Sequence, residues 1–486
     1  MGKSEKVIGN FIWRLLERFG AQGVTLVVSI VLARLLDPAV YGTIALVTVF
    51  TSLLHVFIDS GLGTALIQKK DADDLDFSSV FFFNMAMCIL LYVGLFIAAP
   101  FIASFYGIPE LTAIVRVLGL TLIISGIKNI QQAYVSRNML FKKFFFATLG
   151  GTLGAAVVGI TMAYLGFGVW ALVSQYLFNA IVDTLVLWFT VKWRPKWMFS
   201  FERLKSLLGF GSKLLGVSLI TTIYNDIRQI LIGKLYTTSD LAFYNKAKQF
   251  PALFDSNINT SIDSILLPTM SKEQDDINSV KAITRRSIKT STYIMAPILI
   301  GLAMCGDAFI ELLLTEKWLP CVPYMRIFCI TYIFTPMFTA NYNAYKALGR
   351  SDLYLKVSII SKIFGLIILL VTLPFGVMTM AYGLLVGNFI SQLVCTFPNR
   401  KLLGYSYGEQ LLDILPNLAL TALMGGLVYA VEFLNLNAIV TLVIQIPLGV
   451  AVYVLGSMLF KNESYQYVLN TAKSFLQRRR RKKETN

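Results

Sequence analysis

Two arginines stand in the first half of a stretch, Asn10 to Leu36, that is long and apolar enough to cross a bilayer. At helical spacing its polar residues fall on one stripe, and leucine, isoleucine and valine occupy the opposite face. The stripe consists of Asn10, Arg14, Arg18, Gln22, Thr25 and Ser29. A helix in lipid keeps arginines only where they face protein or water. The pattern therefore predicts a membrane helix that lines a polar cavity.

Three other apolar stretches also carry polar faces. The second stretch carries Thr48, Ser52, His55 and Asp59; the seventh carries Ser218, Thr222, Asn225 and Gln229, flanked by Asp226 and Arg228; the eighth carries Lys246, Lys248, Asp255 and Asn257 among others. Polar groups thus gather in the first two helices of each half of the chain. This distribution predicts a central cavity between two lobes.

Each of these charges also has a purely structural interpretation. A charge near a helix end, such as Arg14, can extend to the lipid headgroups. Lys246 and Lys248 can bind an anion or extend in the same way. His55 and Asp59 fit either a proton-responsive pair or a hydrogen-bonded pair that packs two helices. The candidates for linkage to H⁺ or Na⁺ are His55, Asp59, Asp226 and Asp255, and no motif chooses among them.

The composition predicts an integral membrane protein built of helices. Of the 486 residues, 56% are hydrophobic and 14% are charged, and the mean hydropathy is +0.67. A soluble domain has roughly 45–50% apolar and about 25% charged residues. No cleavage site follows a short apolar region, so we expect the first helix to be retained.

Several chemistries are not expected. The net charge of +16 resides in short connections and one tail, which argues against nucleic acid as a partner. Five scattered cysteines without a CxxC pair, together with a single histidine, His55, argue against a metal centre, and no cofactor is expected. No Walker motif is present, so any energy input must come from an ion gradient or from the gradient of a substrate.

We count fourteen candidate spans. They cover residues 10–36, 41–66, 79–104, 111–135, 144–165, 168–191, 207–235, 240–266, 289–314, 320–346, 354–374, 378–398, 411–432 and 437–460. Most of the 43 Lys and Arg residues lie in alternate connections and the tail, whereas the intervening connections contain only Lys317. By the positive-inside rule both termini are then cytoplasmic.

The expected architecture is an all-α polytopic membrane protein with two pseudo-symmetric six-helix lobes and two further C-terminal helices. Its parts are an N-terminal lobe (1–191), a cytoplasmic amphipathic linker (192–206), a C-terminal lobe (207–400), the two added helices (401–460) and a basic cytoplasmic tail (461–486). Two DxD tripeptides, Asp71–Asp73 and Asp74–Asp76, lie in a short connection without a nucleotide-binding domain. We interpret them as a solvated acidic cap.

Short motifs resemble a known transporter family. The stretches are LARLLDPAVYGTIALV (Leu32–Val47), FIDSGLGTALIQK (Phe57–Lys69), IGKLYTTSDLAFYNKAKQF (Ile232–Phe250) and ILLPTMSK (Ile265–Lys272). They are similar to Wzx-type flippases of lipid-linked oligosaccharides, in the multidrug/oligosaccharidyl-lipid/polysaccharide exporter superfamily. The chain looks most like the branch with colanic-acid and teichuronic-acid exporters.

The resemblance implies alternating access and export of an undecaprenyl-pyrophosphate-linked oligosaccharide across the inner membrane. It implies that Arg14 and Arg18, with Arg228, Lys246 and Lys248, contact the pyrophosphate, since an arginine fork fits such an anion. Gln22, Thr25, Asn225, Gln229 and Asn257 would line the cavity beside the sugar. Membrane lipids and polysaccharide polymerase or assembly proteins are the other partners it implies.

Three alternatives remain open. The first is an ion-coupled multidrug exporter of the same superfamily, against which the excess of basic cavity residues argues. The second is a membrane polymerase or glycosyltransferase, which usually needs a sizeable extramembrane domain that this sequence lacks. The third is a scaffold subunit of a polysaccharide assembly complex.

Overall fold

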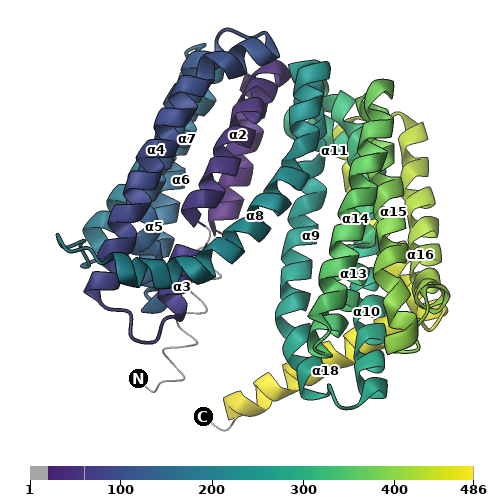
Figure 1. Ribbon diagram of the computed structural model, residues 1–486. Helices are drawn as coiled ribbons and strands as arrows, with labels where there is room; N and C mark the ends of the chain where they lie inside the picture. The colour runs from purple at the N-terminus through teal and green to yellow at the C-terminus, as the bar shows by residue number, and fades with distance from the viewer. Residues whose placement is uncertain (1–19, 60, 485–486) are drawn as a thin grey trace. The chain divides into compact units, whose positions relative to one another are not determined.

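The computed structural model of the chain describes residues 20–59 and 61–484, and no strand occurs in that part (Figure 1). The predicted all-α membrane class is confirmed. Eleven of its helices are long and apolar enough to cross a membrane, or twelve if the two segments of a bent helix count as one span. Two predicted spans fall outside that count: residues 10–36, whose first half is not described, and residues 240–266, whose helix is too polar. The number fourteen and the cytoplasmic termini stay predictions.

The helices form two compact units, Met1–Ala242 and Phe243–Asn486. In the first unit, α4 pairs with α5, α6 pairs with α7, and α2 packs on α5 and α8 (Figure 1). Its helices are Gly20–Leu35, α2 (Pro38–Asp59), α3 (Leu62–Gln68), α4 (Asp74–Tyr106), α5 (Leu111–Arg137), α6 (Phe141–Tyr164), α7 (Val169–Thr190) and α8 (Phe201–Leu235).

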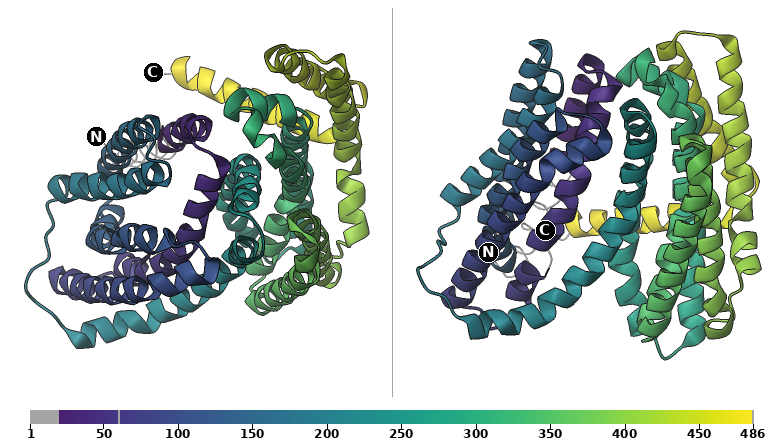
Figure 2. Two further views of the ribbon diagram at one scale, coloured as in Figure 1. Left: turned by 90° about the horizontal axis from the view of Figure 1, so that it is seen from above. Right: turned by 45° about the horizontal axis from the view of Figure 1, so that its top comes forward.

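The second unit holds most of α9, which spans Thr238–Lys272. In this unit α10 packs on α12, α13 and α16, and α14 pairs with α15. The remaining helices are α10 (Ile277–Met304), α11 (Gly306–Leu314), η1 (Glu316–Cys321), α12 (Val322–Ile333), α13 (Thr335–Ala347), α14 (Ser351–Thr372), η2 (Leu373–Phe375), α15 (Val377–Leu402), α16 (Tyr407–Ala430), η3 (Val431–Leu434), α17 (Ala438–Leu459) and α18 (Glu463–Glu484). In the views of Figures 1 and 2, α18 runs crosswise to the other long helices of this unit.

Two turns of the same length connect corresponding helices of the two halves. The first helix ends at Leu35 and α2 begins at Pro38, while α8 ends at Leu235 and α9 begins at Thr238. The sequences before the two turns are similar, IVLARL over Ile30–Leu35 and LIGKL over Leu231–Leu235. The similarity of the two stretches therefore extends to their local structure, as expected for a duplicated helical hairpin.

Gly61 and Gly211 permit close backbone contact between the chain before α3 and the bend of α8. Gly61, between α2 and α3, has φ +96°, and a Cβ built on it would lie 2.4 Å from the Gly211 Cα. In α8 the segments Phe201–Gly209 and Leu214–Leu235 meet at an angle of 53°. Only glycine combines this φ with backbone contact. Gly61 of the stretch Phe57–Lys69 therefore lies directly before α3, in a conformation that glycine adopts readily.

Candidate functional site

The polar faces of α2 and α8 meet in the first unit. The Ser52 hydroxyl donates to Asp226 Oδ2 at 2.8 Å, and the Gln229 amide donates to Asp226 Oδ1 at 3.2 Å. Serine and glutamine lie on the faces that the helical period predicts. Because both carboxylate oxygens accept a hydrogen bond, Asp226 links the two helices and is itself held in place. We call Ser52, Tyr224, Asp226, Arg228 and Gln229 the α2–α8 cluster.

Arg228 is the cationic member of this cluster, and only 8% of it is exposed. Its guanidinium carbon lies 5.6 Å from the centre of the Tyr224 ring. Within the described part of the chain, Arg228 Nε is buried and has no hydrogen-bond partner. A buried cation with an unused donor is costly in a protein interior, so its presence calls for an explanation. The arrangement can bind an anion at little cost, since the guanidinium is already desolvated.

The other candidate site residues of the first unit stay predictions, and their positions differ in exposure. Thr25 and Asn225 are exposed, whereas Gln22 and His55 are half-buried and each makes a contact. Arg14 and Arg18 lie outside the described residues, as does the side chain of Asp59, the last residue of α2. The pairing of His55 with Asp59 thus stays a prediction.

A buried ion pair joins α5 and α7 in the same unit. Lys128 Nζ lies 2.8 Å from Asp183 Oδ2, and both side chains are largely buried. Asp183 Oδ1 has no hydrogen-bond partner in the described chain. The sequence shows both residues as charges within apolar stretches. The helical period relates residues of one helix, so it could not predict that these two residues of different helices form a pair. Pairing inside the protein explains how both charges are tolerated in the bilayer.

In the second unit, α9 and α13 share a ladder of polar contacts. The Asn259 amide donates to Asp255 Oδ1 at 2.5 Å, the Thr339 hydroxyl donates to Asn259 Oδ1 at 3.2 Å, and the Asn343 amide donates to Asp263 Oδ1 at 2.7 Å. Thr335 adds a hydrogen bond to Asp255. The partners on α13, Thr335, Thr339 and Asn343, recur at steps of four residues. That spacing is the signal that the sequence analysis missed.

The predicted cationic pair of α9 divides into two environments. Lys246 is 5% exposed, and its ammonium lies 5.6 Å from the centre of the Trp318 ring in η1. Lys248 is half-buried. Asn257, the predicted sugar contact of the same helix, donates to the Leu253 carbonyl at 2.8 Å. Lys246 is therefore placed for a cation–π contact, and anion binding by either lysine stays a prediction.

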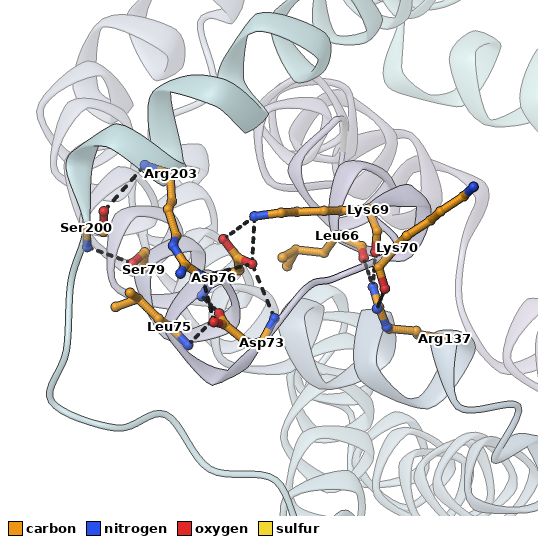
Figure 3. Close-up of polar contacts among 10 residues, drawn as sticks. All are labelled: Leu66, Lys69, Lys70, Asp73, Leu75, Asp76, Ser79, Arg137, Ser200 and Arg203. Carbon is orange, nitrogen blue, oxygen red and sulfur yellow. Dashed lines mark hydrogen bonds and ion pairs between the residues drawn. The ribbon is translucent and has the colours of Figure 1, made fainter.

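The acidic residues at the start of α4 belong to a dense network (Figure 3). Asp73 and Asp76 form a reciprocal capping box at the helix start. Asp76 is fully buried, and both its oxygens accept from Lys69 Nζ at 2.7 Å. Arg203 Nη1 lies 2.6 Å from Asp73 and 3.5 Å from Asp76. The prediction of a solvated acidic cap is wrong for Asp76, because α8 folds back over it.

The segment between α7 and α8 completes this network. The backbone N–H groups of Lys196 and Ser200 donate to the hydroxyls of Ser78 and Ser79, at 3.0 and 2.9 Å. The Trp193 indole donates to Asp74 at 3.2 Å, and its ring packs against those of Phe77 and Tyr134.

Arg137, at the end of α5, fixes the chain between α3 and α4. It donates to three carbonyls, those of Leu66, Lys69 and Lys70. We call the following charged and hydroxyl residues around the start of α4 the α4 network: Lys69, Asp73, Asp74, Asp76, Ser78, Ser79 and Arg203.

The fold and the buried polar clusters define a helical membrane protein that can hold a polar or anionic ligand among its helices. The model of the family described as polysaccharide biosynthesis protein matches residues 31–323. The chain belongs to this family, and the predicted resemblance to polysaccharide transporters is confirmed. No group of three or more His, Cys, Asp or Glu residues suited to a metal occurs in the described residues.

Two curated relatives and one solved structure are similar to the chain. The succinoglycan biosynthesis transport protein ExoT of Rhizobium meliloti (strain 1021) is 25% identical over 69% of this chain and 68% of its own length. The teichuronic acid biosynthesis protein TuaB of Bacillus subtilis (strain 168) is 26% identical over 83% and 85%. The structure of the lipid II flippase MurJ, in an inward closed conformation, covers 93% of this chain and 99% of its own, with a TM-score of 0.74 and 15% identity. The last likeness shows that the fold is shared.

Proposed function

We propose that the chain is a flippase that moves an undecaprenyl-pyrophosphate-linked oligosaccharide from the cytoplasmic to the outer leaflet of the inner membrane. Export of such units serves the synthesis of a surface polysaccharide such as O-antigen, capsule or exopolysaccharide. The family and the polysaccharide-related names of the relatives support this proposal. The observation that carries it is the buried Arg228, whose Nε has no partner in the described chain.

A pyrophosphate suits this guanidinium because it is a compact anion with several acceptor oxygens. Planar N–H groups of arginine bind phosphate oxygens in a bidentate manner. We assign the pyrophosphate to Arg228, Arg14 and Arg18, with Lys246 and Lys248 as further cationic contacts. Amide and hydroxyl groups of Gln22, Thr25, Asn225, Gln229 and Asn257 would bind the sugar, which needs polar partners. The polyprenyl tail would remain in the lipid.

Coupling to an ion gradient is part of the same proposal. Asp226 and Asp255 accept hydrogen bonds from neighbouring hydroxyl or amide groups. Each carboxylate could bind H⁺ or Na⁺, and such intramembrane carboxylates commonly mark ion pathways. His55 and Asp59 form the second candidate pair. Transport assays with an imposed proton gradient, a sodium gradient or neither would identify the coupling ion.

The central test is flipping by the purified full chain in liposomes. A fluorescent undecaprenyl-pyrophosphate oligosaccharide is incorporated in both leaflets, and a membrane-impermeant reductant bleaches the outer one. A flippase lets the reductant bleach nearly all of the dye, whereas protein-free liposomes retain about half of it. Protection of half the dye in the protein-containing liposomes would overturn the proposal. A lengthened sugar product would instead identify a polymerase or glycosyltransferase.

The first helix provides a second test. Combined substitution of Arg14→Ala and Arg18→Ala should slow flipping if these residues receive the pyrophosphate. The same variant should still export a small organic cation if the chain were a drug exporter, because no anion is then bound. Unchanged flipping would remove both arginines from the binding site.

A further inference from the structure

Two adjoining cavities lie where α10, α16 and α18 meet in the second unit. Their volumes are about 530 and 460 Å³, and both are lined by Lys289, Glu463 and Ser464. None of the residues assigned to the transport site lines either cavity. Residues 282–290 of α10 line them, and residues 412–423 of α16 line the larger one; both helices begin on the face that the sequence predicts to be cytoplasmic. This junction therefore needs an explanation other than transport.

Four cations and two carboxylates surround the cavities. Asp413 accepts from Arg285 at 2.6 Å, and Glu463 accepts from Lys289 at 2.5 Å. Arg286 and Lys461 form no ion pair with any described residue; Arg286 lies over the Tyr467 ring, 5.0 Å from its centre. The charges of Arg286 and Lys461 are therefore not balanced by a carboxylate of the cavity lining. The junction carries a local positive charge that an anion can neutralise.

The larger cavity also has an apolar wall on α16. The wall consists of Leu412, Pro416, Ala419 and Leu423, at steps of four, three and four residues. These four side chains share one stripe of the helix, and all of them are exposed. The eleven helical steps from Leu412 to Leu423 extend about 16 Å, a distance that takes the stripe well into the apolar part of a leaflet. A ligand of this junction is therefore anionic at one end and apolar along the other.

The short segment between α17 and α18 connects the three helices of this junction through hydrogen bonds. Lys461 adopts the left-handed conformation with φ +48°, and Asn462 accepts from the N–H groups of Ser464 and Tyr465 at the start of α18. The Asn462 amide donates to Asn417 at 2.8 Å, and the Asn417 amide donates to the Lys289 carbonyl at 3.0 Å. A residue other than glycine with positive φ costs free energy, so the surrounding contacts must fix it.

The sequence of α18 suits the surface of an anionic membrane. The helix runs crosswise to its unit (Figure 2), and its sequence ends in the run RRRRKK over residues 478–483. Basic helices that lie along a bilayer concentrate anionic lipids around them. An anionic lipid is thus the ligand that the surroundings supply to the junction.

We propose that the junction of α10, α16 and α18 binds one anionic phospholipid of the surrounding bilayer, independently of the transported substrate. Its phosphate contacts Arg286 and Lys461, and one acyl chain lies along the apolar stripe of α16. Binding fastens α18 to the second unit, because the lipid touches all three helices. This site is distinct from transport, and its occupation is measurable whether or not the chain is a flippase.

Native mass spectrometry of the full chain in a neutral detergent tests the phosphate half of this site. Phosphatidylglycerol and phosphatidylcholine of identical acyl chains are titrated in parallel. The wild type should retain one phosphatidylglycerol in preference to phosphatidylcholine. The double variant Arg286→Gln/Lys461→Gln should bind it about thirtyfold more weakly, since each surface cation contributes roughly 1 kcal/mol. Equal retention by variant and wild type would overturn the site.

The matched control removes two exposed cations of the same unit, Lys272→Gln and Lys356→Gln. It changes the net charge equally and should leave phosphatidylglycerol binding within twofold of wild type. An equal loss in this control would mean that total charge, and not the junction, attracts the lipid. Equal melting temperatures of the two variants would exclude misfolding as the cause of a difference.

Two further arms separate a lipid from a free anion. Ala419→Trp fills the apolar wall without changing charge and should weaken binding of phosphatidylglycerol, whereas Leu415→Trp, exposed but outside the cavity lining, should not. Glycerol 3-phosphate at the lipid's concentration should not compete. Full competition by glycerol 3-phosphate, with no effect of Ala419→Trp, would show a free-phosphate site and overturn the lipid proposal.

Discussion

The α4 network and the α2–α8 cluster use charge in opposite ways within one unit. In the α4 network, Asp76 is fully buried, yet it accepts from Lys69 and is capped by Asp73. In the α2–α8 cluster, Arg228 is almost as buried, but its Nε has no partner in the described chain. Burial alone therefore does not distinguish a structural charge from a functional one. What differs between these two charges is the pairing: Asp76 has a cationic partner, whereas Arg228 Nε has no hydrogen-bond partner in the described residues.

Burial of the two charges should affect the stability of the empty protein in different ways. A buried carboxylate with full pairing stabilises the fold as long as its partners remain, and its loss leaves cations unpaired. A buried guanidinium with an unused donor lowers stability in the empty protein and recovers that free energy when an anion arrives. Substitution should thus affect stability in the first region and transport in the second.

The largest expected effect is on transport by Arg228→Gln. Glutamine keeps a polar side chain of similar reach but loses the charge and the fork. A lost charged hydrogen bond costs about 1.5–3 kcal/mol, so flipping should slow by roughly ten- to a hundredfold. The measurement is the initial bleaching rate in the liposome assay, and Arg228→Lys should recover only part of it, since an ammonium cannot bind in a bidentate manner.

Arg116→Gln is the matched control for this substitution. Arg116 belongs to the same unit and also lies over an aromatic ring, 4.1 Å from the centre of Phe96, but it is half-exposed. Its loss should leave flipping within twofold of wild type. The melting temperature of Arg228→Gln should equal or exceed that of the wild type. A lower melting temperature with normal flipping would make Arg228 a structural residue and end the contrast between the regions.

The second effect is on stability, through Asp76→Asn. The amide cannot satisfy Lys69 and Arg203 as the carboxylate does, and the capping of α4 is weakened. The free energy of unfolding, measured by denaturant titration in detergent micelles, should fall by about 2 kcal/mol. Flipping per folded molecule should be unchanged at low temperature. A variant as stable as the wild type would show that the network contributes nothing to the fold.

The sequence predicts which faces of the helices are polar, but not which residues meet. The period of α2 and α8 places Ser52 and Gln229 on the correct faces, because 3.6 residues per turn fixes the direction of each side chain. The period does not fix the offset between two helices along their axes. Asp226, beside the main stripe of α8, could therefore not be identified as the shared acceptor.

Burial of charge in a connection was equally beyond the sequence. Asp76 is the last residue of the acidic stretch Asp71–Asp76, and such stretches are usually solvated. Its burial depends on α8 and the segment before it, more than a hundred residues later, folding back with Arg203 and Trp193. By contrast, the all-helical membrane class follows from composition and segment length, which tertiary contacts do not alter.

A smaller effect is expected from Ser52→Ala in the α2–α8 cluster. The substitution removes one of the two hydrogen bonds to Asp226. Hydrogen bonds between membrane helices contribute about 0.6 kcal/mol on average and at most about 1.7 kcal/mol, so the unfolding free energy should fall by that amount. Thr152→Ala is the control, because among the described residues Thr152 donates only to the Thr148 carbonyl of its own helix. Equal losses in both variants would deny the link between α2 and α8.

The smallest effect is the pH dependence that Asp73 adds to the α4 network. The backbone N–H of Asp76 and the guanidinium of Arg203 lower the pKa of Asp73 from 3.8 to about 2. A carboxyl group with a lower pKa in the folded state contributes stability above its unfolded pKa and loses it as protons bind. The difference in melting temperature between wild type and Asp73→Asn should therefore be constant above about pH 5 and shrink from pH 4 to pH 2. Asp73 is half-exposed, so salt should reduce this difference, whereas the cost of Asp76→Asn should respond less because Asp76 is buried. A difference that is the same at pH 2 and pH 6 would mean that capping by the Asp73 side chain, and not its charge, connects it to the network.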